Sequence, residues 1–204
     1  MELRLPVPSK IRDYFDESAG QYAERSALPL WRWQRNRELA AVRLLLGELD
    51  GLEVLDLGCG AGFYTRYCLQ QGARRVLAVD FSPRMVEQLP RSRVTAIVAD
   101  AKGINLDNPV PKIVCAGLLE FVDSPEEVLT NARRLVVSDG TMVCLVPPDN
   151  LAGRLYRKFH QRNDVGISLF SEAAFGDLAS RAGWTVDKLV SVFPYTSVFR
   201  LMPG

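Results

Sequence analysis

The chain has 204 residues, of which 48% are hydrophobic and 24% are charged, and its formal net charge is +1. This length suits one globular domain whose core is large enough to need no disulfide or structural metal. The near-neutral charge argues against nucleic acid as the main partner, because that role usually requires a strongly basic face. The longest apolar runs, such as 113–119, reach about a third of the ~20 residues that span a bilayer, so no transmembrane segment is expected.

The first ten residues and the cysteines bear on the cellular compartment of the protein. Residues 1–10 contain Pro6 and Pro8 but no apolar stretch, so they do not resemble a secretory signal. The four cysteines form no CxxC pair, and the chain has one histidine, so we expect neither a disulfide framework nor a metal site. These features predict unpaired thiols and a reducing, cytoplasmic location.

The first part of the chain is predicted to be helical. Leu39, Val42, Leu46 and Leu49 lie on one helix face, and a weaker helix is predicted over 10–25. Short apolar runs then predict strands, which we place at 54–57, 75–80, 94–98, 112–117 and 141–146.

Two helix starts are marked between these strands. Ser82-Pro83 combines an N-cap residue with a first-turn proline, and 124–127 has the pattern of a capping box. The helix after Ser124 carries an apolar stripe, and we expect Asp139-Gly140 to turn the chain from this helix into the fifth strand.

The pattern after Pro148 predicts two helices followed by two strands. The first helix is amphipathic, with Leu151, Leu155 and Phe159 on one side and a basic set, Arg154, Arg157, Lys158 and Arg162, on the other. A helix from Ser171 to Gly183 should bury Phe175, Leu178 and Ala182. The strands 184–192 and 195–202 have no helix between them and should pair antiparallel.

The alternation of apolar strands with amphipathic helices indicates an α/β fold. Continuous apolar strands are typical of a parallel sheet that is covered by helices on both faces. In such a sheet, ligands bind at the carboxyl ends of the strands.

The most informative stretch is Asp56-Leu57-Gly58-Cys59-Gly60-Ala61-Gly62, which we call the glycine loop. Glycines between a strand and a helix let a ligand approach the main-chain N–H groups. A dinucleotide fingerprint requires G-x-G-x-x-G, but Phe63 occupies the position after Gly62. Asp56 beside the loop would repel a pyrophosphate and attract a cationic ligand.

Three carboxylates are predicted at the ends of successive strands. Asp56, Asp80 and Asp100 each end an apolar run, and a carboxylate at the end of the second strand can bind both hydroxyls of a ribose. Any one of them could simply cap a loop or helix. Their joint placement favours a ligand site.

These motifs resemble those of the class I S-adenosylmethionine-dependent methyltransferases, most closely the small-molecule enzymes that act on quinones and tetrapyrroles. The glycine loop resembles their first motif, and 79–85, 99–101 and 115–122 resemble the second, the third and the fourth-strand motifs. The resemblance covers roughly residues 50–148. It implies a Rossmann-like, doubly wound seven-stranded sheet that is mostly parallel, with an antiparallel C-terminal strand and an N-terminal helical lid.

The resemblance also implies a domain plan and a cofactor. We expect one methyltransferase domain over 1–204, with a helical lid at 1–50, a cofactor-binding core at 51–148, and an acceptor-site insertion with the C-terminal strands at 149–204. The cofactor would be S-adenosyl-L-methionine, which leaves as S-adenosyl-L-homocysteine.

The motif positions imply individual roles toward that cofactor. The glycines of the loop would face the methionine moiety, Asp56 would lie near its ammonium group, and Asp80 would bind the ribose hydroxyls. The adenine would meet Phe81, Met85, Asp100 and Ala101, and backbone near Gly117 would hold the amino-acid part. The predicted cofactor-binding residues are Asp56, Gly58, Gly60, Gly62, Asp80, Phe81, Met85, Asp100, Ala101 and Gly117.

The acceptor side is less well marked. His160 is the single histidine and follows the fifth strand, where acceptor pockets of this family form. We expect it to be a catalytic base or a substrate contact, and the alternative is a surface histidine on a basic helix. Phe121 stands where many quinone methyltransferases carry a histidine, so any role that depends on that histidine is absent here.

Aromatic and basic residues give further candidates for the acceptor site. The predicted substrate-pocket residues are Tyr14, Tyr22, Trp31 and Tyr156, although aromatic residues at such spacing more often belong to a core. The basic residues of 154–162, with Arg32, Arg35 and Arg37, could attract an acidic acceptor. A solvated helix face is the preferred interpretation for most of them.

The predicted reaction is transfer of a methyl group to a small-molecule acceptor by in-line displacement. O-methylation is favoured over N- or C-methylation, and a monomer or homodimer is expected. A nucleic-acid or protein N-methyltransferase is disfavoured, because 117–120 reads Gly-Leu-Leu-Glu in place of an Asn/Asp-Pro-Pro-aromatic motif. Two alternatives remain: an NAD(P)-dependent Rossmann oxidoreductase and a non-catalytic module that binds the same cofactor.

Overall fold

A mixed seven-stranded sheet forms the centre of the described part of the protein, in the order β3-β2-β1-β4-β5-β7-β6. The computed structural model describes residues 11, 14, 16, 29–162 and 165–204. The strands are β1 (Glu53–Leu57), β2 (Arg75–Asp80), β3 (Val94–Val98), β4 (Val110–Ala116), β5 (Val136–Val146), β6 (Trp184–Val192) and β7 (Thr196–Pro203). β1 to β5 pair in parallel, and β7 runs antiparallel to both β5 and β6. The predicted Rossmann-like sheet with an antiparallel C-terminal strand is therefore confirmed.

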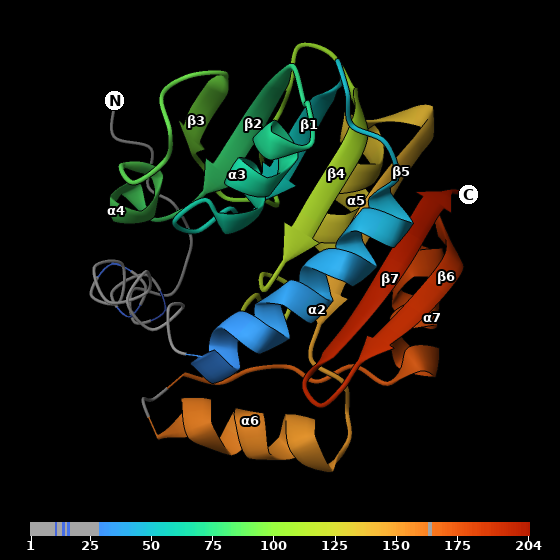
Figure 1. Cartoon of the computed structure of the whole chain (residues 1–204). Helices are drawn as coiled ribbons and strands as arrows, with labels where there is room; N and C mark the ends of the chain where they lie inside the picture. The colour runs from blue at the N-terminus through green and yellow to red at the C-terminus, as the bar shows by residue number, and fades with distance from the viewer. Residues whose placement is uncertain (1–10, 12–13, 15, 17–28, 163–164) are drawn as a thin grey trace.

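Helices cover both faces of this sheet (Figure 1). They are α2 (Pro29–Leu46), α3 (Phe63–Gln70), α4 (Pro83–Val86), α5 (Pro125–Leu135), α6 (Leu151–Gln161) and α7 (Glu172–Arg181). One apolar core joins α2 and α3 to the sheet, and a second joins α5 and α7 to the opposite face. α6 lies across the carboxyl ends of the parallel strands instead of against either face (Figure 1).

The predicted apolar stripes of α5 and α7 are confirmed. Val128, Leu129, Ala132 and Leu135 of α5 are buried in the second core. The inward side of α7 and its end at Gly183 also agree with the prediction, and Gly183 has a φ of 81°. These stripes pack because both helices lie flat on the sheet.

Two predictions around α5 are wrong. Ser124 precedes the helix, but its side chain makes no capping hydrogen bond. The Ser82 hydroxyl caps α4 as predicted, and the Ser171 hydroxyl caps α7. Asp139-Gly140 does not separate α5 from β5, because the strand already begins at Val136, directly after α5. The register between β5 and β4 shifts at this point: Val110 pairs with Val136, but Lys112 pairs with Thr141. The strand β5 therefore has extra residues, 137–140, opposite a single residue of β4.

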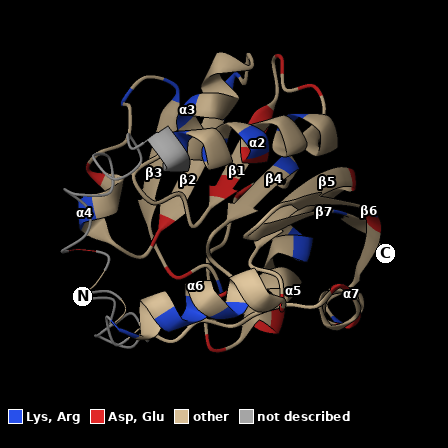
Figure 2. Cartoon of the chain, turned by 60° about the horizontal axis from the view of Figure 1, so that its bottom comes forward, with Lys and Arg blue, Asp and Glu red and all other residues tan. Residues whose placement is uncertain are grey.

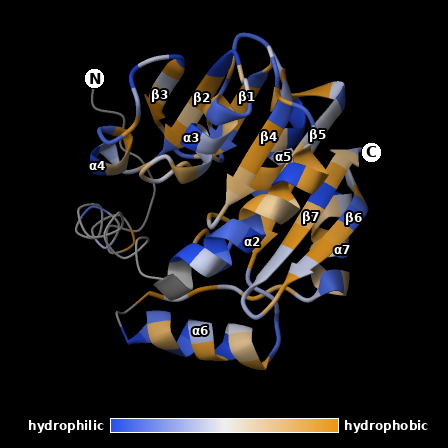
Figure 3. Cartoon of the chain, in the orientation of Figure 1, coloured by the Kyte–Doolittle hydropathy of each residue, from blue (hydrophilic) through white to orange (hydrophobic). Residues whose placement is uncertain are grey.

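The apolar side of α6 points outward. Leu151, Leu155 and Phe159 are 77%, 58% and 51% exposed, while Gly153 and His160 of the same helix are buried. An amphipathic helix in a globular domain normally turns its apolar side toward the core. Figure 3 shows the hydrophobic bands on α6. In the described ranges, no helix combines the length and apolarity that crossing a membrane requires.

Candidate active site

The glycine loop joins β1 to α3 at the carboxyl edge of the sheet. Gly58, Gly60 and Gly62 have φ angles of 76°, 50° and 85°, which side-chain-bearing residues rarely adopt. A Cβ on Gly58 would lie 2.8 Å from the Leu118 Cβ, and one on Gly62 would lie 2.5 Å from the Leu89 Cδ2. Gly62 therefore serves the close packing of the loop, whereas a Cβ on Gly60 would meet nothing within 4 Å.

Asp80 connects the glycine loop to the chain that follows β2. Its Oδ2 accepts a hydrogen bond from the Gly60 N–H at 2.9 Å, and its Oδ1 accepts one from the Ser82 N–H at 2.9 Å. The side chain is buried, and burial raises the pKa of Asp80 although these N–H groups oppose the shift. The result is a carboxylate held in one position at the end of β2.

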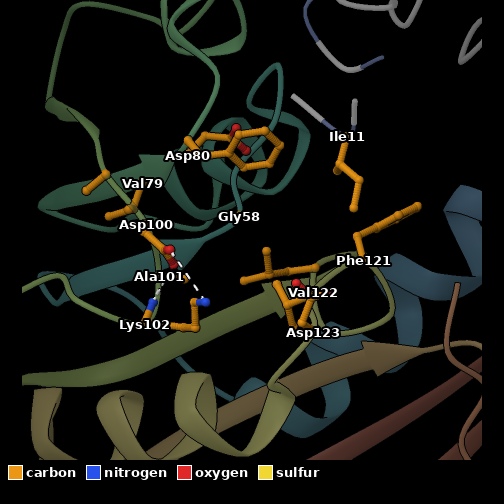
Figure 4. A pocket seen from close by; sticks show the side chains of 13 residues that line it. Ile11, Gly58, Val79, Asp80, Asp100, Ala101, Lys102, Phe121, Val122 and Asp123 are labelled. Atoms are coloured by element: carbon orange, nitrogen blue, oxygen red, sulfur yellow. Dashed lines mark hydrogen bonds and ion pairs between the residues drawn. The ribbon is translucent and has the colours of Figure 1, made fainter. Parts of the chain in front are cut away.

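Two cavities meet at Asp80. The larger has a volume of about 380 Å³ and is bounded by the glycine loop, α2, α3 and the residues after β4. The second is a narrow cavity of about 40 Å³ beside the ends of β2 and β3 (Figure 4). Residues that line both cavities are Gly58, Asp80, Phe81, Leu118 and Phe121. The two cavities thus form one crevice, with Asp80 at its centre.

The crevice brings together the predicted cofactor-binding residues, with the exception of Asp56 and Gly62. Gly60, Met85 and Gly117 line the larger cavity. Asp100 and Ala101 line the narrow one. Gly58, Asp80 and Phe81 line both.

Asp56 lies behind the glycine loop and not on the crevice wall. It is 1% exposed, and its Oδ2 accepts a hydrogen bond from the Thr65 hydroxyl at 2.5 Å. Its Oδ1 has no hydrogen-bond partner among the described residues. Burial raises the pKa of Asp56 to about 7. At neutral pH this carboxyl group is only partly ionised, so the expected attraction of a cation by Asp56 has a weak electrostatic basis.

The narrow end of the crevice is ordered by Asp100. Its Oδ1 accepts a hydrogen bond from the Lys102 N–H at 2.9 Å, and its Oδ2 lies 3.9 Å from the Lys102 Nζ (Figure 4). From α5, the Asn131 side chain donates to the carbonyl groups of Ala101 and Ile104, at 3.0 and 2.9 Å. The loop after β3 is therefore held from two directions.

Two described residues of the N-terminal segment contact the crevice or the chain beside it. Ile11 lines the narrow cavity, and Figure 4 shows it near Phe121. Asp16 accepts a hydrogen bond from the Ser82 hydroxyl. Most of the helix predicted over 10–25 lies outside the described residues, but these contacts place Ile11 on the crevice wall and Asp16 at the start of α4.

His160 lies on the buried inner side of α6, so the alternative interpretation as a surface histidine is wrong. Its ring centroid lies 4.5 Å from that of Tyr156, 5.6 Å from that of Phe121 and 6.4 Å from that of Tyr14. Its Nδ1 makes no hydrogen bond within the described residues, and burial lowers the pKa of His160. Phe121 also lines both cavities, so the imidazole packs against a residue of the crevice wall.

The predicted substrate-pocket residues have different outcomes. Tyr14 and Tyr156 lie beside His160, each in a T-shaped arrangement with the imidazole. Trp31 belongs to α2, but its side chain lies outside the described residues, as does the whole of Tyr22.

Arg35 was missed as a cofactor-site candidate because the sequence places it in a basic run. The structure places it in the lining of the larger cavity. Its guanidinium carbon lies 4.8 Å from the Phe63 ring centroid, and its Nη1 lies 3.8 Å from the Glu38 Oε2. These contacts hold a positive charge close to the glycine loop.

Glu120 was missed as a site residue altogether. It is 6% exposed, and its Oε1 would lie 3.8 Å from a Cβ on Gly117, a glycine that lines the larger cavity. Its Oε2 has no hydrogen-bond partner in the described part of the chain. Burial, with a further contribution from the Glu38 charge, raises the pKa of Glu120 to about 8. An acidic residue inside the apolar run 118–122 was the signal that could have found it.

Comparison with known proteins decides the family. Residues 30–189 match the model of a methyltransferase domain. The chain belongs to this methyltransferase family. The chain is 32% identical over 104 residues to the ubiquinone biosynthesis O-methyltransferase of Leptothrix cholodnii, an alignment that covers 47% of this chain and 44% of that protein. It is also 40% identical over 125 residues to protein arginine N-methyltransferase 6 of Xenopus laevis, covering 61% of this chain and 32% of that protein.

The solved structures agree with this assignment at the level of the fold. The magnesium protoporphyrin IX methyltransferase of Synechocystis, crystallised with S-adenosylhomocysteine, superposes with a TM-score of 0.74 at 18% identity, and the match covers 96% of this chain and 99% of that chain. The chain spans less than half of the length of the curated relatives described above. Those relatives act on different acceptors, so family membership leaves the acceptor open.

Proposed function

We propose that this chain binds S-adenosylmethionine and transfers its methyl group to a small-molecule acceptor, releasing S-adenosylhomocysteine. The observation that carries the proposal is the crevice around Asp80, where one buried carboxylate lies between two cavities. Membership of the methyltransferase family supports the reaction class.

The residues of the crevice fit this cofactor. The larger cavity extends into the space that a Cβ on Gly60 would occupy, which leaves the main chain of the loop accessible to a ligand. Asp80 would hold the ribose hydroxyls. Asp100 and Ala101 would meet the adenine edge, and the guanidinium of Arg35 would attract the carboxylate of the methionine part. A sulfonium cofactor bound there supplies an activated methyl group, so the protein mainly positions the acceptor and excludes water.

The surroundings of His160 support a flat, largely apolar acceptor and favour O-methylation. Tyr14, Tyr156 and Phe121 present aromatic rings around the imidazole. Because burial keeps His160 neutral at physiological pH, its Nδ1 can accept a proton from an acceptor hydroxyl. The similarity to a ubiquinone O-methyltransferase supports the same choice.

The domain plan and the location are part of the proposal. We assign cofactor binding to 51–148 together with Arg35 of α2, and acceptor binding to 149–204 with the N-terminal lid. All four cysteines are buried and unpaired, which supports a reducing compartment such as the cytoplasm.

Calorimetry on the purified chain tests the cofactor. We expect binding of S-adenosylmethionine and S-adenosylhomocysteine but not of NADH. Asp80→Asn should weaken the binding of both nucleosides by about 10- to 100-fold, because hydrogen bonds to a charged group contribute ~1.5–3 kcal/mol. Asp107→Asn, in an exposed loop, is the matched control and should change nothing. Binding of NADH with no binding of S-adenosylmethionine would identify an oxidoreductase instead.

A screen of small molecules for methylated product tests the chemistry. With any acceptor that turns over, His160→Gln should lower the rate by about 10²–10⁴-fold while the affinity for S-adenosylmethionine stays unchanged. Unchanged turnover at every pH would remove His160 from the reaction. Cofactor binding with no product from any acceptor would favour the non-catalytic module.

A further inference from the structure

The outer surface of α6 carries two parallel rows of side chains. Leu151, Leu155 and Phe159 follow each other at four-residue spacing, and all three are mostly exposed. Arg154, Lys158 and Arg162 follow the same spacing and are also exposed. Residues three and four apart are neighbours on a helix surface, so the apolar row and the basic row run side by side, and not on opposite sides of the helix as the sequence predicted. We call these six residues the α6 face.

The charge of the α6 face has one sign. The sequence between Asn150 and Arg162 contains no acidic residue. Asp149 lies just before the helix and pairs with Arg154 at 2.9 Å. Figure 2 shows the basic residues spread along α6. The surface therefore combines exposed apolar area with positive charge, which differs from an ordinary solvated helix face.

The inner side of α6 prevents the helix from turning its apolar row inward. Gly153 packs so closely that a Cβ there would lie 1.9 Å from the Pro148 carbonyl oxygen. About two turns further on, His160 is buried among aromatic rings. Rotation of the helix would remove both contacts, so the exposure of the apolar row is built into the fold.

The turn between β6 and β7 adds to this surface. Phe193 is 71% exposed at the turn, and Tyr195 is exposed beside it. The Tyr195 ring centroid lies 6.2 Å from that of Tyr156 on α6. Figure 1 shows the turn and α6 at the same end of the molecule. The apolar area is therefore larger than one helix and forms a continuous end of the protein.

We propose that the α6 face docks on a membrane surface that contains anionic phospholipid. A helix with apolar and basic rows lies in the plane of a bilayer, where its apolar side chains enter the boundary below the headgroups and its basic side chains bind anionic headgroups. Charge favours this occupant over a second copy of the chain, because two copies would bring identical positive rows together. Docking would place the His160 side of the crevice next to the lipid.

Vesicle co-sedimentation with the full chain tests the proposal. We expect binding to vesicles of phosphatidylcholine mixed with phosphatidylglycerol, little binding to pure phosphatidylcholine, and weaker binding as salt is raised. The variant Arg154→Gln/Lys158→Gln/Arg162→Gln should bind the mixed vesicles about 100-fold more weakly, since each basic residue contributes ~1 kcal/mol near such a surface. This variant should also lose the salt dependence.

The apolar row has its own variant and a matched control. Leu151→Gln/Leu155→Gln/Phe159→Gln should weaken vesicle binding by more than about tenfold, because three side chains lose apolar burial. Leu44→Gln should bind like the wild type, because Leu44 is an equally exposed leucine on α2, away from the α6 face. Circular dichroism checks that each variant folds. If the apolar triple variant does not fold, the single variant Leu155→Gln is used in its place.

Three results would overturn the proposal. The first is no binding of the wild type to the mixed vesicles, and the second is equal binding after either triple substitution. The third is a wild-type dimer in sedimentation velocity that Leu155→Gln dissociates, because the α6 face would then be covered by a second copy. Calorimetry with S-adenosylmethionine on the same samples is a separate measurement, so the loss of vesicle binding leaves the proposed function standing.

Discussion

α5 and α6 are helices of equal length and similar amphipathic pattern, yet they use their apolar sides in opposite ways. α5 buries Val128, Leu129 and Ala132 completely, whereas α6 exposes most of Leu151 and Leu155. α5 connects two neighbouring parallel strands, and such a crossover must lie flat on the sheet. α6 follows β5 and lies beyond the strand ends, where no sheet face remains to cover. Periodicity therefore identifies the apolar side of a helix but not what that side faces.

The polar groups buried under the two helices differ as well. On the α5 side, both N–H groups of the Asn131 amide are used, by the carbonyls of Ala101 and Ile104. On the α6 side, the His160 Nδ1 is buried without such a bond among the described residues. A satisfied buried amide serves the fold, whereas an unsatisfied imidazole near a cavity suits a group that meets a ligand.

The largest expected effect tests the packing difference directly. Leu129→Ala should lower the free energy of unfolding by about 2–5 kcal/mol, because it removes a fully buried side chain and leaves a cavity. Leu155→Ala, the same substitution on α6, should change stability by less than about 0.5 kcal/mol. Urea unfolding of both variants measures the contrast, and equal losses would show that α6 packs as α5 does.

The second prediction concerns the pH dependence of stability on the α6 side. The Glu120 carbonyl accepts a hydrogen bond from the Ser168 N–H, in the chain after α6, and burial raises the Glu120 pKa to about 8 from an ordinary value of 4.5. Between these values the folded chain holds a proton that the unfolded chain has released. Stability should therefore fall as pH rises, by up to about 1.4 kcal/mol per pH unit for this group.

Burial also raises the pKa of Asp56 to about 7, so this group likewise makes the free energy of unfolding fall as pH rises. Glu120→Gln should remove the Glu120 share and make the stability curve between about pH 4.5 and 8 shallower. Glu127→Gln, an exposed position on α5, should leave the slope as it is. Chemical unfolding across this pH range measures the stability curves of the wild type and of both variants. An unchanged slope in Glu120→Gln would mean that Glu120 ionises in the folded chain as it does in the unfolded one.

The smallest effect distinguishes the starts of the two helices. The Asn150 side chain accepts a hydrogen bond from the Gly153 N–H at 2.8 Å, so Asn150→Ala should cost about 1 kcal/mol. Ser124→Ala should cost less than about 0.5 kcal/mol, because the Ser124 side chain caps nothing at the start of α5. Thermal unfolding of the pair resolves the difference, and a reversed order would show that Ser124 does cap α5 in solution.

The sequence by itself determined the layered α/β fold, the position of the glycine loop and most of the crevice. Apolar runs of strand length, glycine at a strand–helix junction, and Asp80 and Asp100 at strand ends are local features, and neighbouring residues in the chain suffice to express them. This is why the Asp80 environment and the antiparallel C-terminal strand agree with expectation.

Only the tertiary structure decided which charges remain on the crevice and which sides of the helices stay exposed. Arg35 lines the crevice through the packing of α2. Glu120 is buried next to Gly117, which lines the crevice, and Asp56 is buried away from the crevice wall. The outward side of α6 depends on the contact of Gly153 with Pro148. Burial is set by segments that are distant in the sequence, so a local pattern cannot contain it.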